Sequence, residues 1–454
     1  MSNNQRMIKK LEKYMGAADI FRIYDNEAGI AFLDSSLVND LGHYSVIGRC
    51  PYLRLVKDGE VFTVNGKTEK SKTFEEYMRK YLDSHVDVAQ KNLPIVSGAI
   101  GYLSYDYGMD RMGIASCLDD VVAVPEAVMT FYDCFIIEDC WEKETYLVAN
   151  GITGDARSKV CEMEAVIEKT RNRMKYEKVE HDNINIHPDR SEEDYECAIK
   201  KMKDYITEGD IYVANMTRQL VIESDKDPIE VFYDLRRSNP SPFGGYLDFE
   251  GYQIVCASPE RFLQMKDQRV VTRPIKGTRK RGGTSAEDDK FRRELEDSQK
   301  EKSELLMIVD LERNDLNRVC RPGSVKVTEL FAIEEYATVF HQVAGVEGIL
   351  EKGEDVMSLL DVAFPGGSVT GAPKHRAMEI IDELERGKRN IYTGSIGYIS
   401  MNGDCDFNIV IRTVLHRDDR YYLGVGGGIT AESDPESEYE ETWDKAKAIL
   451  KALQ

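Results

Sequence analysis

The chain has 454 residues, of which 42% are hydrophobic, so it can bury a large core and its length predicts about two to four domains. Its formal net charge of −21 argues against non-specific binding to nucleic acid or to anionic membranes, but it does not exclude a local cationic pocket. No apolar run approaches the ~20 residues of a membrane span, and the polar N-terminal stretch lacks the apolar core of a signal peptide, so we expect a cytoplasmic protein without membrane contact.

Nine cysteines are scattered along the chain without a C-x-x-C pair. This usage is typical of reduced thiols and disfavours a disulfide framework or a zinc site. The seven histidines show no metal-binding spacing either. Any metal is therefore expected to be a hard ion held by carboxylates.

The N-terminal region, residues 1–187, is predicted to consist of strands with a few helices. Alternating patterns predict three strand-rich segments, at 28–36, 52–66 and 134–151. Asp58-Gly59 interrupts the second segment and the charged stretch 142–144 interrupts the third, so each is predicted to form a hairpin.

A predicted linker divides the chain. Residues 177–194 are charged, contain Pro188 and include few apolar side chains. We therefore place an N-terminal region at 1–187 and a catalytic region at 188–454.

Helix signals are clear in the second region. Ser191 is predicted to cap a helix that Gly209 ends. Ser285 is predicted to cap one long helix that reaches about residue 315, and Asp434 opens a terminal helix. Strands are predicted at 391–400, 407–415 and 421–425. The irregular alternation indicates a mixed, mostly antiparallel α+β architecture.

Lys276 lies between two conformationally special residues, Pro274 and Gly277. Proline fixes φ, and glycine permits positive φ or a close approach of the backbone to a ligand. Such a lysine is either a surface cation beside a turn or an amine aimed at a substrate.

Carboxylates recur on two predicted helices. Glu304 stands among apolar residues, where a carboxylate is costly unless it is paired or bound to a ligand. Glu438 and Glu441 are three residues apart on one helix face, with Lys445 one turn further. Three such carboxylates suit a Mg²⁺ ion that keeps several waters. A solvated acidic helix face is the alternative.

Two glycine-rich segments, 365–374 and 425–430, are candidate anion cradles. A nucleotide-binding P-loop would need lysine directly after Gly371, but Ala372 stands there. A nucleoside triphosphatase is therefore disfavoured. The segments are expected either to hold a carboxylate or to form ordinary tight turns.

Three further residues are candidates. Glu260 follows an apolar run across a proline bend and can serve as a general acid if burial raises its pKa, or it can simply pair with Arg261. Arg412 stands in an apolar predicted strand, where a guanidinium needs an anion. His341 without context is most simply a hydrogen-bonded core histidine.

Together these segments resemble the chorismate-utilising enzymes, which include the component I subunits of anthranilate synthase and aminodeoxychorismate synthase. The resemblance rests on the motifs SPERF, RPIKGTRKRG, SELLMIVDLERNDLNRV, FPGGSVTGAPKHRAME, IYTGSIGYI, FNIVIRT and VGGGITAESDPESEYEET. It implies an α/β (α+β) fold of two antiparallel sheets packed face to face with helices outside. The N-terminal region resembles the family more weakly, through FLDSS and HYSVIG. In the family the first of these segments lies near a tryptophan pocket, but we do not expect tryptophan binding here.

The resemblance also implies roles for individual residues. Glu304 and Glu441, with Glu438 nearby, match the Mg²⁺ ligands that hold the ring carboxylate of chorismate. Lys445 is expected close to that carboxylate, which would accept hydrogen bonds from the backbone of Gly426, Gly427 and Gly428.

The remaining matches lie around the ring and its side chain. Arg412 and Tyr392 are expected to hold the enolpyruvyl carboxylate. Glu260 matches the general acid that helps the C4 hydroxyl leave. The ring is expected to be lined by Gly277, Thr278, His341 and Ser368.

Lys276 separates the subfamilies that the chain resembles. Anthranilate synthases and most hydrating relatives typically have alanine here, in PIAGT, whereas aminodeoxychorismate synthases typically have lysine, in PIKGT. In the latter the amine is thought to add at ring C2 before ammonia attacks C4. Val213 stands where aminating relatives often carry glutamine and water-adding relatives carry lysine, so an isochorismate or salicylate synthase is disfavoured and that pocket wall is expected to be apolar.

These matches predict component I of aminodeoxychorismate synthase, an enzyme of 4-aminobenzoate and folate biosynthesis. No glutaminase signature is visible in the sequence, so ammonia is expected from a separate glutamine amidotransferase subunit. Anthranilate synthase component I and a non-catalytic metabolite-binding regulatory subunit are the alternatives.

Overall fold

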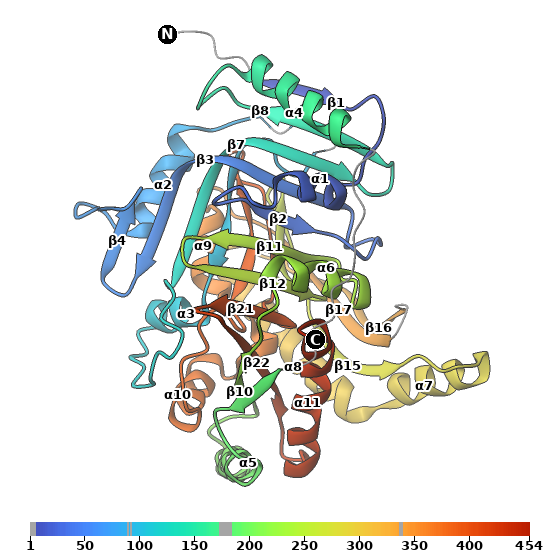
Figure 1. The fold of residues 1–454 in the computed structure, drawn as a ribbon. Coiled ribbons are helices and arrows are strands. Elements are labelled where there is room, and N and C mark those ends of the chain that lie inside the picture. Colours follow the sequence, from blue (N-terminus) through green and yellow to red (C-terminus); the bar gives the residue numbers. More distant parts are fainter. Residues whose placement is uncertain (1–5, 89, 91–92, 172–183, 336–338) are drawn as a thin grey trace.

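The computed structural model describes residues 6–88, 90, 93–171, 184–335 and 339–454. Twenty-two strands within these ranges are linked into one network, and the pairings between them are antiparallel. Two branches of this network begin at β7 (Ala127–Asp139), which is labelled in Figure 1. Every residue of this strand is buried. The antiparallel α+β fold class is confirmed. The strands belong to one connected sheet, and its division into two sheets packed face to face stays a prediction.

The first branch leads from the N-terminal region into the C-terminal one. From β7 it continues through β3 (Tyr44–Asp58), β2 (Ala31–Asp34), β11 (Phe243–Phe249), β12 (Tyr252–Ser258), β21 (Thr413–Arg417), β22 (Arg420–Ile429) and β10 (Val213–Glu223). Its last strand, β10, also pairs with β9 (Asn185–Pro188) and β18 (Gly371–Ala372). Strands flanking its start are β1 (Met7–Lys10), β4 (Val61–Val64), β5 (Lys67–Thr68) and β8 (Glu144–Ala149).

The second branch leaves the other side of β7. It continues through β6 (Gly98–Leu103), β19 (Ser395–Ser400), β20 (Cys405–Asn408), β13 (Arg261–Lys266), β14 (Arg269–Arg273) and β17 (Val339–Ile349). At its far end β17 also pairs with β15 (Ile275–Lys280) and β16 (Lys326–Glu335). The two branches therefore end on different strands, β10 with β22 and β15 with β17.

Two of the crossovers of the chain between the branches run from β12 to β13 and from β20 to β21. The two crossovers are bonded to each other: the Ile409 amide donates to the Glu260 carbonyl at 3.0 Å, and the Ala257 amide donates to the Arg412 carbonyl at 3.1 Å. Glu260 and Arg412 are thereby held where one branch passes into the other.

Helices lie mostly at the periphery of the strands (Figure 1). Those that the structure describes are α1 (Ala17–Tyr24), α2 (Phe74–Ser84), α3 (Tyr105–Arg111), α4 (Ala156–Thr170), α5 (Glu192–Glu208), α6 (Pro228–Ser238), α7 (Ser285–Asp297), α8 (Gln299–Asn317), α9 (Val356–Ala363), α10 (Lys374–Leu384) and α11 (Pro435–Ala452), with the 3₁₀ turn η1 (Gly367–Val369). Helix α11 packs against β22, and α8 packs against β17. Each branch end is thus covered by a helix that carries predicted metal ligands.

Several local predictions are confirmed. β3 pairs with β4 across Asp58-Gly59, and β7 pairs with β8 across the charged turn. Ser191 caps α5, whose C-cap residue Gly209 has a left-handed φ of 88°. Asp434 caps α11 by accepting a hydrogen bond from the Ser437 amide.

The single long helix predicted from Ser285 is wrong, because the segment forms two helices. Thr284 caps α7, and Ser298 ends α7 and caps α8 by accepting a hydrogen bond from the Glu301 amide at 3.4 Å. The sequence Ser-Gln-Lys-Glu is itself an S-x-x-E helix start, so the local signal for a new helix is stronger than the continuing periodicity.

Two other boundaries differ from the prediction. The strand expected at 407–415 is interrupted between β20 and β21, and Arg412 lies in this break with a left-handed φ of 51°. The predicted linker is partly a strand, because β9 satisfies backbone groups along the edge of β10; residues 177–183 lie outside the described residues. The strand expected at 391–400 begins only at Ser395.

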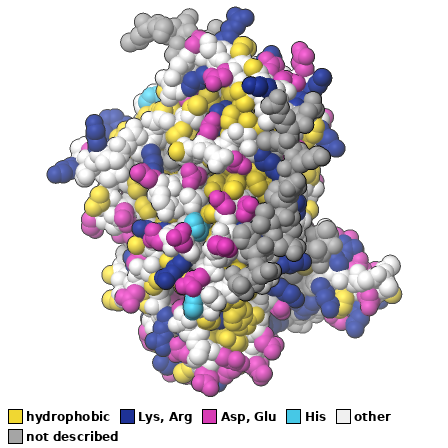
Figure 2. All heavy atoms as spheres, viewed as in Figure 1, with side chains coloured by type: hydrophobic (Ala, Val, Ile, Leu, Met, Phe, Trp, Pro, Cys, Tyr) yellow, Lys and Arg dark blue, Asp and Glu magenta, His cyan; other side chains and the backbone are white. Residues whose placement is uncertain are grey.

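The division at residue 187 stays a prediction. Strands from both sides of it pair, because β2 bonds to β11 and β6 bonds to β19. Charged side chains of both signs intermingle over the face shown in Figure 2. In the part of the chain that the structure describes, no helix is long and apolar enough to cross a membrane.

Candidate active site

A cavity of about 430 Å³ lies where the far ends of the two branches face each other. Strands β15 and β17 line it together with β22 and β10, and α8 and α11 contribute further lining residues. The predicted site residues all line this cavity: Glu260, Lys276, Gly277, Thr278, Glu304, His341, Ser368, Tyr392, Arg412, Gly426, Gly427, Gly428, Glu438, Glu441 and Lys445. Their individual roles stay predictions.

The amine of Lys276 crosses the cavity from β15 toward β22. Its Nζ donates to the Ser368 carbonyl at 3.1 Å and lies 3.5 Å from the position that a Cβ atom on Gly428 would occupy. Gly277 has a φ of 81° at a break in the β15–β17 register, a conformation that favours glycine. This local bend turns the lysine into the cavity, so the interpretation as a surface cation beside a turn is disfavoured.

Glu260 is buried beside the amine, with only 5% of its surface exposed. Its Oε1 accepts a hydrogen bond from the Ser368 hydroxyl at 2.7 Å. Burial raises the pKa of Glu260, although the Ser368 bond and the charge of Lys276 partly oppose it. Arg261 pairs with Asp406 at 2.9 Å, so a structural pairing between Glu260 and Arg261 is not present.

The three predicted metal ligands surround the glycines of β22. Glu304 Oε2 lies 3.8 Å from the Cβ position of Gly428, and Glu438 Oε2 lies 3.0 Å from that of Gly427. Burial raises the pKa of Glu304 and of Glu438. Burial alone would also raise the pKa of Glu441, but the ammonium of Lys445, 2.7 Å from its Oε1, brings that pKa below its ordinary value.

One oxygen of this carboxylate cluster lacks a hydrogen-bond partner. Glu304 Oε1 is buried and has no hydrogen-bond partner, which is costly for a carboxylate. Within the described ranges no three His, Cys, Asp or Glu side chains converge into a complete metal cage. The donor set therefore fits a hard cation such as Mg²⁺ that takes most of its ligands from water or from a bound substrate.

Arg412 supplies an unpaired cation at the opposite wall. Among the described residues no ion pair includes Arg412. Desolvation lowers the pKa of Arg412, and the nearby Tyr392 and Glu441 partly offset that lowering. The Tyr392 ring lies directly on β22: a Cβ on Gly424 would come within 2.1 Å of its Cγ. A half-buried guanidinium beside a phenol is suited to bind a carboxylate.

His341 is a neutral hydrogen-bonding group in this cavity. Its Nδ1 lies 2.8 Å from the Thr278 hydroxyl. Burial and the nearby charge of Arg412 lower the pKa of His341 to about 4, so it carries no charge at neutral pH. It lines the cavity from β17 and is therefore more than a core histidine.

A family model for chorismate binding enzymes matches residues 49–451. The chain belongs to the chorismate-binding enzyme family. Anthranilate synthase component 1 of Cereibacter sphaeroides is 35% identical over 91% of this chain and 86% of its own length. Aminodeoxychorismate synthase component 1 of Bacillus subtilis is 39% identical over 79% of this chain and 77% of its own length.

Solved structures agree with the fold of this chorismate-binding enzyme. Anthranilate synthase component I from Streptococcus pneumoniae TIGR4 is 28% identical and superposes with a TM-score of 0.82, covering 91% of this chain and 93% of that chain. The menaquinone-specific isochorismate synthase from Escherichia coli shares the fold at a TM-score of 0.74 with 15% identity, covering 99% and 94% of the two chains.

Some lining residues of this chorismate-binding enzyme were not predicted from the sequence. Asn215 on β10 and Lys300 on α8 line the cavity, and Lys300 Nζ lies 3.8 Å from Glu438 Oε1. Val213 Cγ2 lies 3.9 Å from the Cβ position of Gly428, which Lys276 Nζ also approaches at 3.5 Å, so the apolar wall expected at Val213 stays a prediction. The S-x-x-E signal that starts α8 could have identified Lys300, whereas Asn215 has no local signal.

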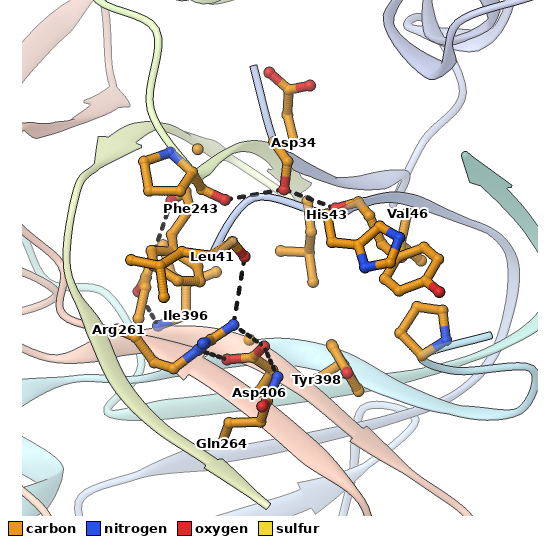
Figure 3. Close-up of a pocket in the computed structure, with 18 of the residues that line it drawn as sticks. Asp34, Leu41, His43, Val46, Phe243, Arg261, Gln264, Ile396, Tyr398 and Asp406 are labelled. Atoms are coloured by element: carbon orange, nitrogen blue, oxygen red, sulfur yellow. Dashed lines mark hydrogen bonds and ion pairs between the residues drawn. The ribbon is translucent and has the colours of Figure 1, made fainter. Parts of the chain in front are cut away.

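A second cavity of about 270 Å³ lies between β2, β11 and β20 (Figure 3). It is lined by residues of FLDSS and HYSVIG, including Asp34 and His43. Figure 3 shows Arg261 reaching the Asp406 carboxylate and the Leu41 carbonyl, at 2.9 and 3.4 Å. These bonds satisfy the guanidinium within the protein, in contrast to Arg412.

Proposed function

We propose that this protein is component I of an aminodeoxychorismate synthase, which aminates chorismate at C4 to form 4-amino-4-deoxychorismate for 4-aminobenzoate and folate synthesis. The coarser assignment follows from the family: it is a chorismate-utilising enzyme of the component I type that anthranilate and aminodeoxychorismate synthases share. Relatives with both names have similar identity, so identity does not decide between the two reactions. The observation that supports amination is the cavity-facing amine of Lys276.

Lys276 and Glu260 are proposed to act together. Glu260 donates a proton to the C4 hydroxyl, which leaves as water, while the Nζ of Lys276 forms a bond to ring C2 and the ring double bonds shift. Ammonia then attacks C4, and the bond between C2 and the lysine breaks as the double bonds return. Covalent catalysis of this kind divides one difficult substitution into two easier ones. The high pKa of the buried Glu260 suits a proton donor.

The remaining side chains are proposed to orient chorismate. Arg412 and Tyr392 would hold the enolpyruvyl carboxylate, and the backbone N–H groups of β22 would face the ring carboxylate together with Lys445. Glu304, Glu438 and Glu441 would hold Mg²⁺. When bound, Mg²⁺ supplies positive charge that fixes the ring carboxylate.

The ammonia is proposed to come from a glutamine amidotransferase subunit. The relatives are named as component 1 of their synthases, which implies a second component in those proteins. We accordingly expect turnover with glutamine only when the partner is present, and turnover with ammonium in its absence.

The deciding experiment is mass spectrometry of the products formed from chorismate, Mg²⁺ and ammonium. The wild-type product is expected to keep its enolpyruvyl group. Lys276→Ala is expected to reduce amination by about 100-fold or more, because it removes the nucleophile. Lys280→Ala is the matched control, because Lys280 is an exposed lysine on the same strand.

Two results would contradict this proposal. Prompt release of pyruvate with anthranilate would establish the second candidate, anthranilate synthase component I, whose name several relatives carry. Unchanged amination by Lys276→Ala would remove the covalent step while leaving the substrate assignment intact.

A further inference from the structure

A buried ion pair lies directly behind the substrate cavity. Glu385 follows α10, and Arg389 donates to both of its oxygens, from Nε to Oε2 at 2.9 Å and from Nη2 to Oε1 at 2.7 Å. Their side chains are only 2% and 3% exposed. Burial alone would lower the pKa of Arg389, but the Glu385 carboxylate raises it, so the guanidinium stays charged.

The other donors of Arg389 reach three separate segments. Nη1 donates to the Val369 carbonyl at 2.9 Å and to the Thr393 hydroxyl at 3.2 Å, and Nη2 donates to the Asn215 carbonyl at 2.5 Å. These acceptors belong to η1, to the turn before β19 and to β10. One rigid planar fork thus ties together three pieces of chain that are distant in sequence.

Glu385 extends the same connection to β10. Its Oε1 also accepts hydrogen bonds from the Thr217 amide at 2.9 Å and from the Thr217 hydroxyl at 2.7 Å. The carboxylate therefore fixes Arg389 and anchors the strand that carries Asn215 in one arrangement. Every oxygen of this carboxylate has a partner, as a buried network requires.

The three tied segments carry the groups that face the substrate. Val369 follows Ser368, which bonds to both Glu260 and Lys276. Thr393 follows Tyr392, whose amide donates to the Arg389 carbonyl at 3.0 Å. Arg389 itself does not line the cavity.

We propose that Arg389, oriented by Glu385, is a positioning residue that sets the distance between the Ser368 wall and the Tyr392 wall around the substrate. This rests on the proposed function in one respect, that chorismate occupies the cavity. Each wall contributes to a different part of the ligand, Ser368 beside the reacting carbons and Tyr392 beside the enolpyruvyl carboxylate. A small shift between them would spoil the alignment on which the reaction depends.

The test is Arg389→Lys, which keeps a charge for Glu385 but cannot reach all the acceptors of the guanidinium. We expect kcat/KM for chorismate to fall about 10- to 100-fold. The Mg²⁺ concentration for half-maximal turnover should not change, because the carboxylates stand on α8 and α11, which Arg389 does not contact. A lower kcat/KM with an unchanged Mg²⁺ requirement would distinguish a positioning role from a general loss of folded protein.

The control is another buried ion pair, between Lys226 and Asp234, whose side chains are 1% and 7% exposed and do not line the cavity. Lys226→Met is expected to lower the melting temperature without changing kcat/KM. An Arg389→Lys enzyme that melts earlier but keeps wild-type kcat/KM would overturn the proposal.

A milder variant covers the case in which Arg389→Lys does not fold. Thr393→Val removes only one hydrogen-bond acceptor of the Arg389 guanidinium and keeps the shape of the side chain. It should also lower kcat/KM, but by a smaller factor than Arg389→Lys. No change in kcat/KM for Thr393→Val would also overturn the proposal. The wild-type enzyme measured in parallel shows whether chorismate is consumed and what it becomes, so failure of the proposed function is recognised separately.

Discussion

Ser368 connects the two groups that are proposed to carry the reaction. Its hydroxyl donates to Glu260, and its carbonyl accepts from Lys276. Because both bonds end on one residue of the short η1 turn, the carboxyl group and the amine are held in a fixed relation before any substrate arrives. Such preorganisation lowers the cost of reaching the transition state.

The raised pKa of Glu260 makes a prediction about stability. The folded state binds the carboxyl proton more tightly than the unfolded chain, whose ordinary pKa is 4.5. The stabilisation from this proton is complete below pH 4.5 and is lost as the pH rises through the folded-state pKa. Glu260→Gln cannot ionise, so the free energy of unfolding of wild type minus that of Glu260→Gln should fall with rising pH, by at most about 1.4 kcal/mol per pH unit.

Urea unfolding of both proteins between about pH 4 and pH 8 measures this difference. Glu440→Gln on the exposed face of α11 is the control for the replacement of a glutamate by glutamine. A wild-type minus Glu260→Gln difference that stays constant or rises with pH would contradict the raised pKa.

At the scale of elements, two helices bring the metal-binding candidates together. α8 begins at the break after α7 and directs Glu304 toward β22, while α11 presents Glu438 and Glu441 from the other side. The proposed Mg²⁺ site would take ligands from both helices. The site therefore depends on the relative placement of α8 and α11, which is set by their packing on β17 and β22.

Removal of one carboxylate should weaken metal binding selectively. Glu441→Gln is expected to raise the Mg²⁺ concentration for half-maximal turnover about 10-fold or more, because it removes a negative charge from the cluster. Glu440→Gln, one residue away on the exposed side of the helix, should leave it unchanged. Titration of turnover with Mg²⁺ at saturating chorismate makes the comparison, and equal values for the two variants would argue against a metal at this cluster.

Local signals explain which elements could be predicted. Ser191 and Asp434 are N-cap residues beside periodic helices, so their helices were predictable. The break at Ser298 had a signal that the longer periodicity concealed. Arg412 illustrates the limit, because its left-handed backbone is imposed by the crossover between β20 and β21, a tertiary contact that no neighbouring residue encodes.

Those residues of the candidate site could be predicted whose side chains are unusual for the sequence around them. Glu304 was a carboxylate among apolar neighbours, and Lys276 was an amine beside Gly277. Asn215 and Arg389 were not predicted, because an amide in a strand and a cation after a helix are both ordinary in their local sequence. Their importance arises only when distant segments meet.

At the scale of the whole molecule, the cavity joins the ends of two branches that separate at β7. β15 and β17 end the second branch, and β22 and β10 end the first. A ligand that contacts both ends would connect β15 and β17 to β22 and β10, which do not pair with each other. Binding should therefore stabilise the two ends together.

Hydrogen–deuterium exchange tests this expectation. In the Lys276→Ala variant, in which the substrate should persist, chorismate with Mg²⁺ is expected to slow exchange in peptides from β15, β22 and α11 at once. Peptides from β1 and β4, at the opposite part of the network, serve as controls and should not change. Protection limited to one branch would mean that the ligand does not bridge them.

The pairing of β6 with β19 has a consequence for synthesis of the chain. Residues that pair between these two strands are about 300 positions apart, and beside them the Ser400 hydroxyl donates to the carbonyl of Ser97, which precedes β6. At the usual ~5–20 residues per second, β6 leaves the ribosome tens of seconds before its partner exists. During that interval one edge of a fully buried strand is open, and we expect the nascent chain to depend on protection by chaperones until its C-terminal third has been made.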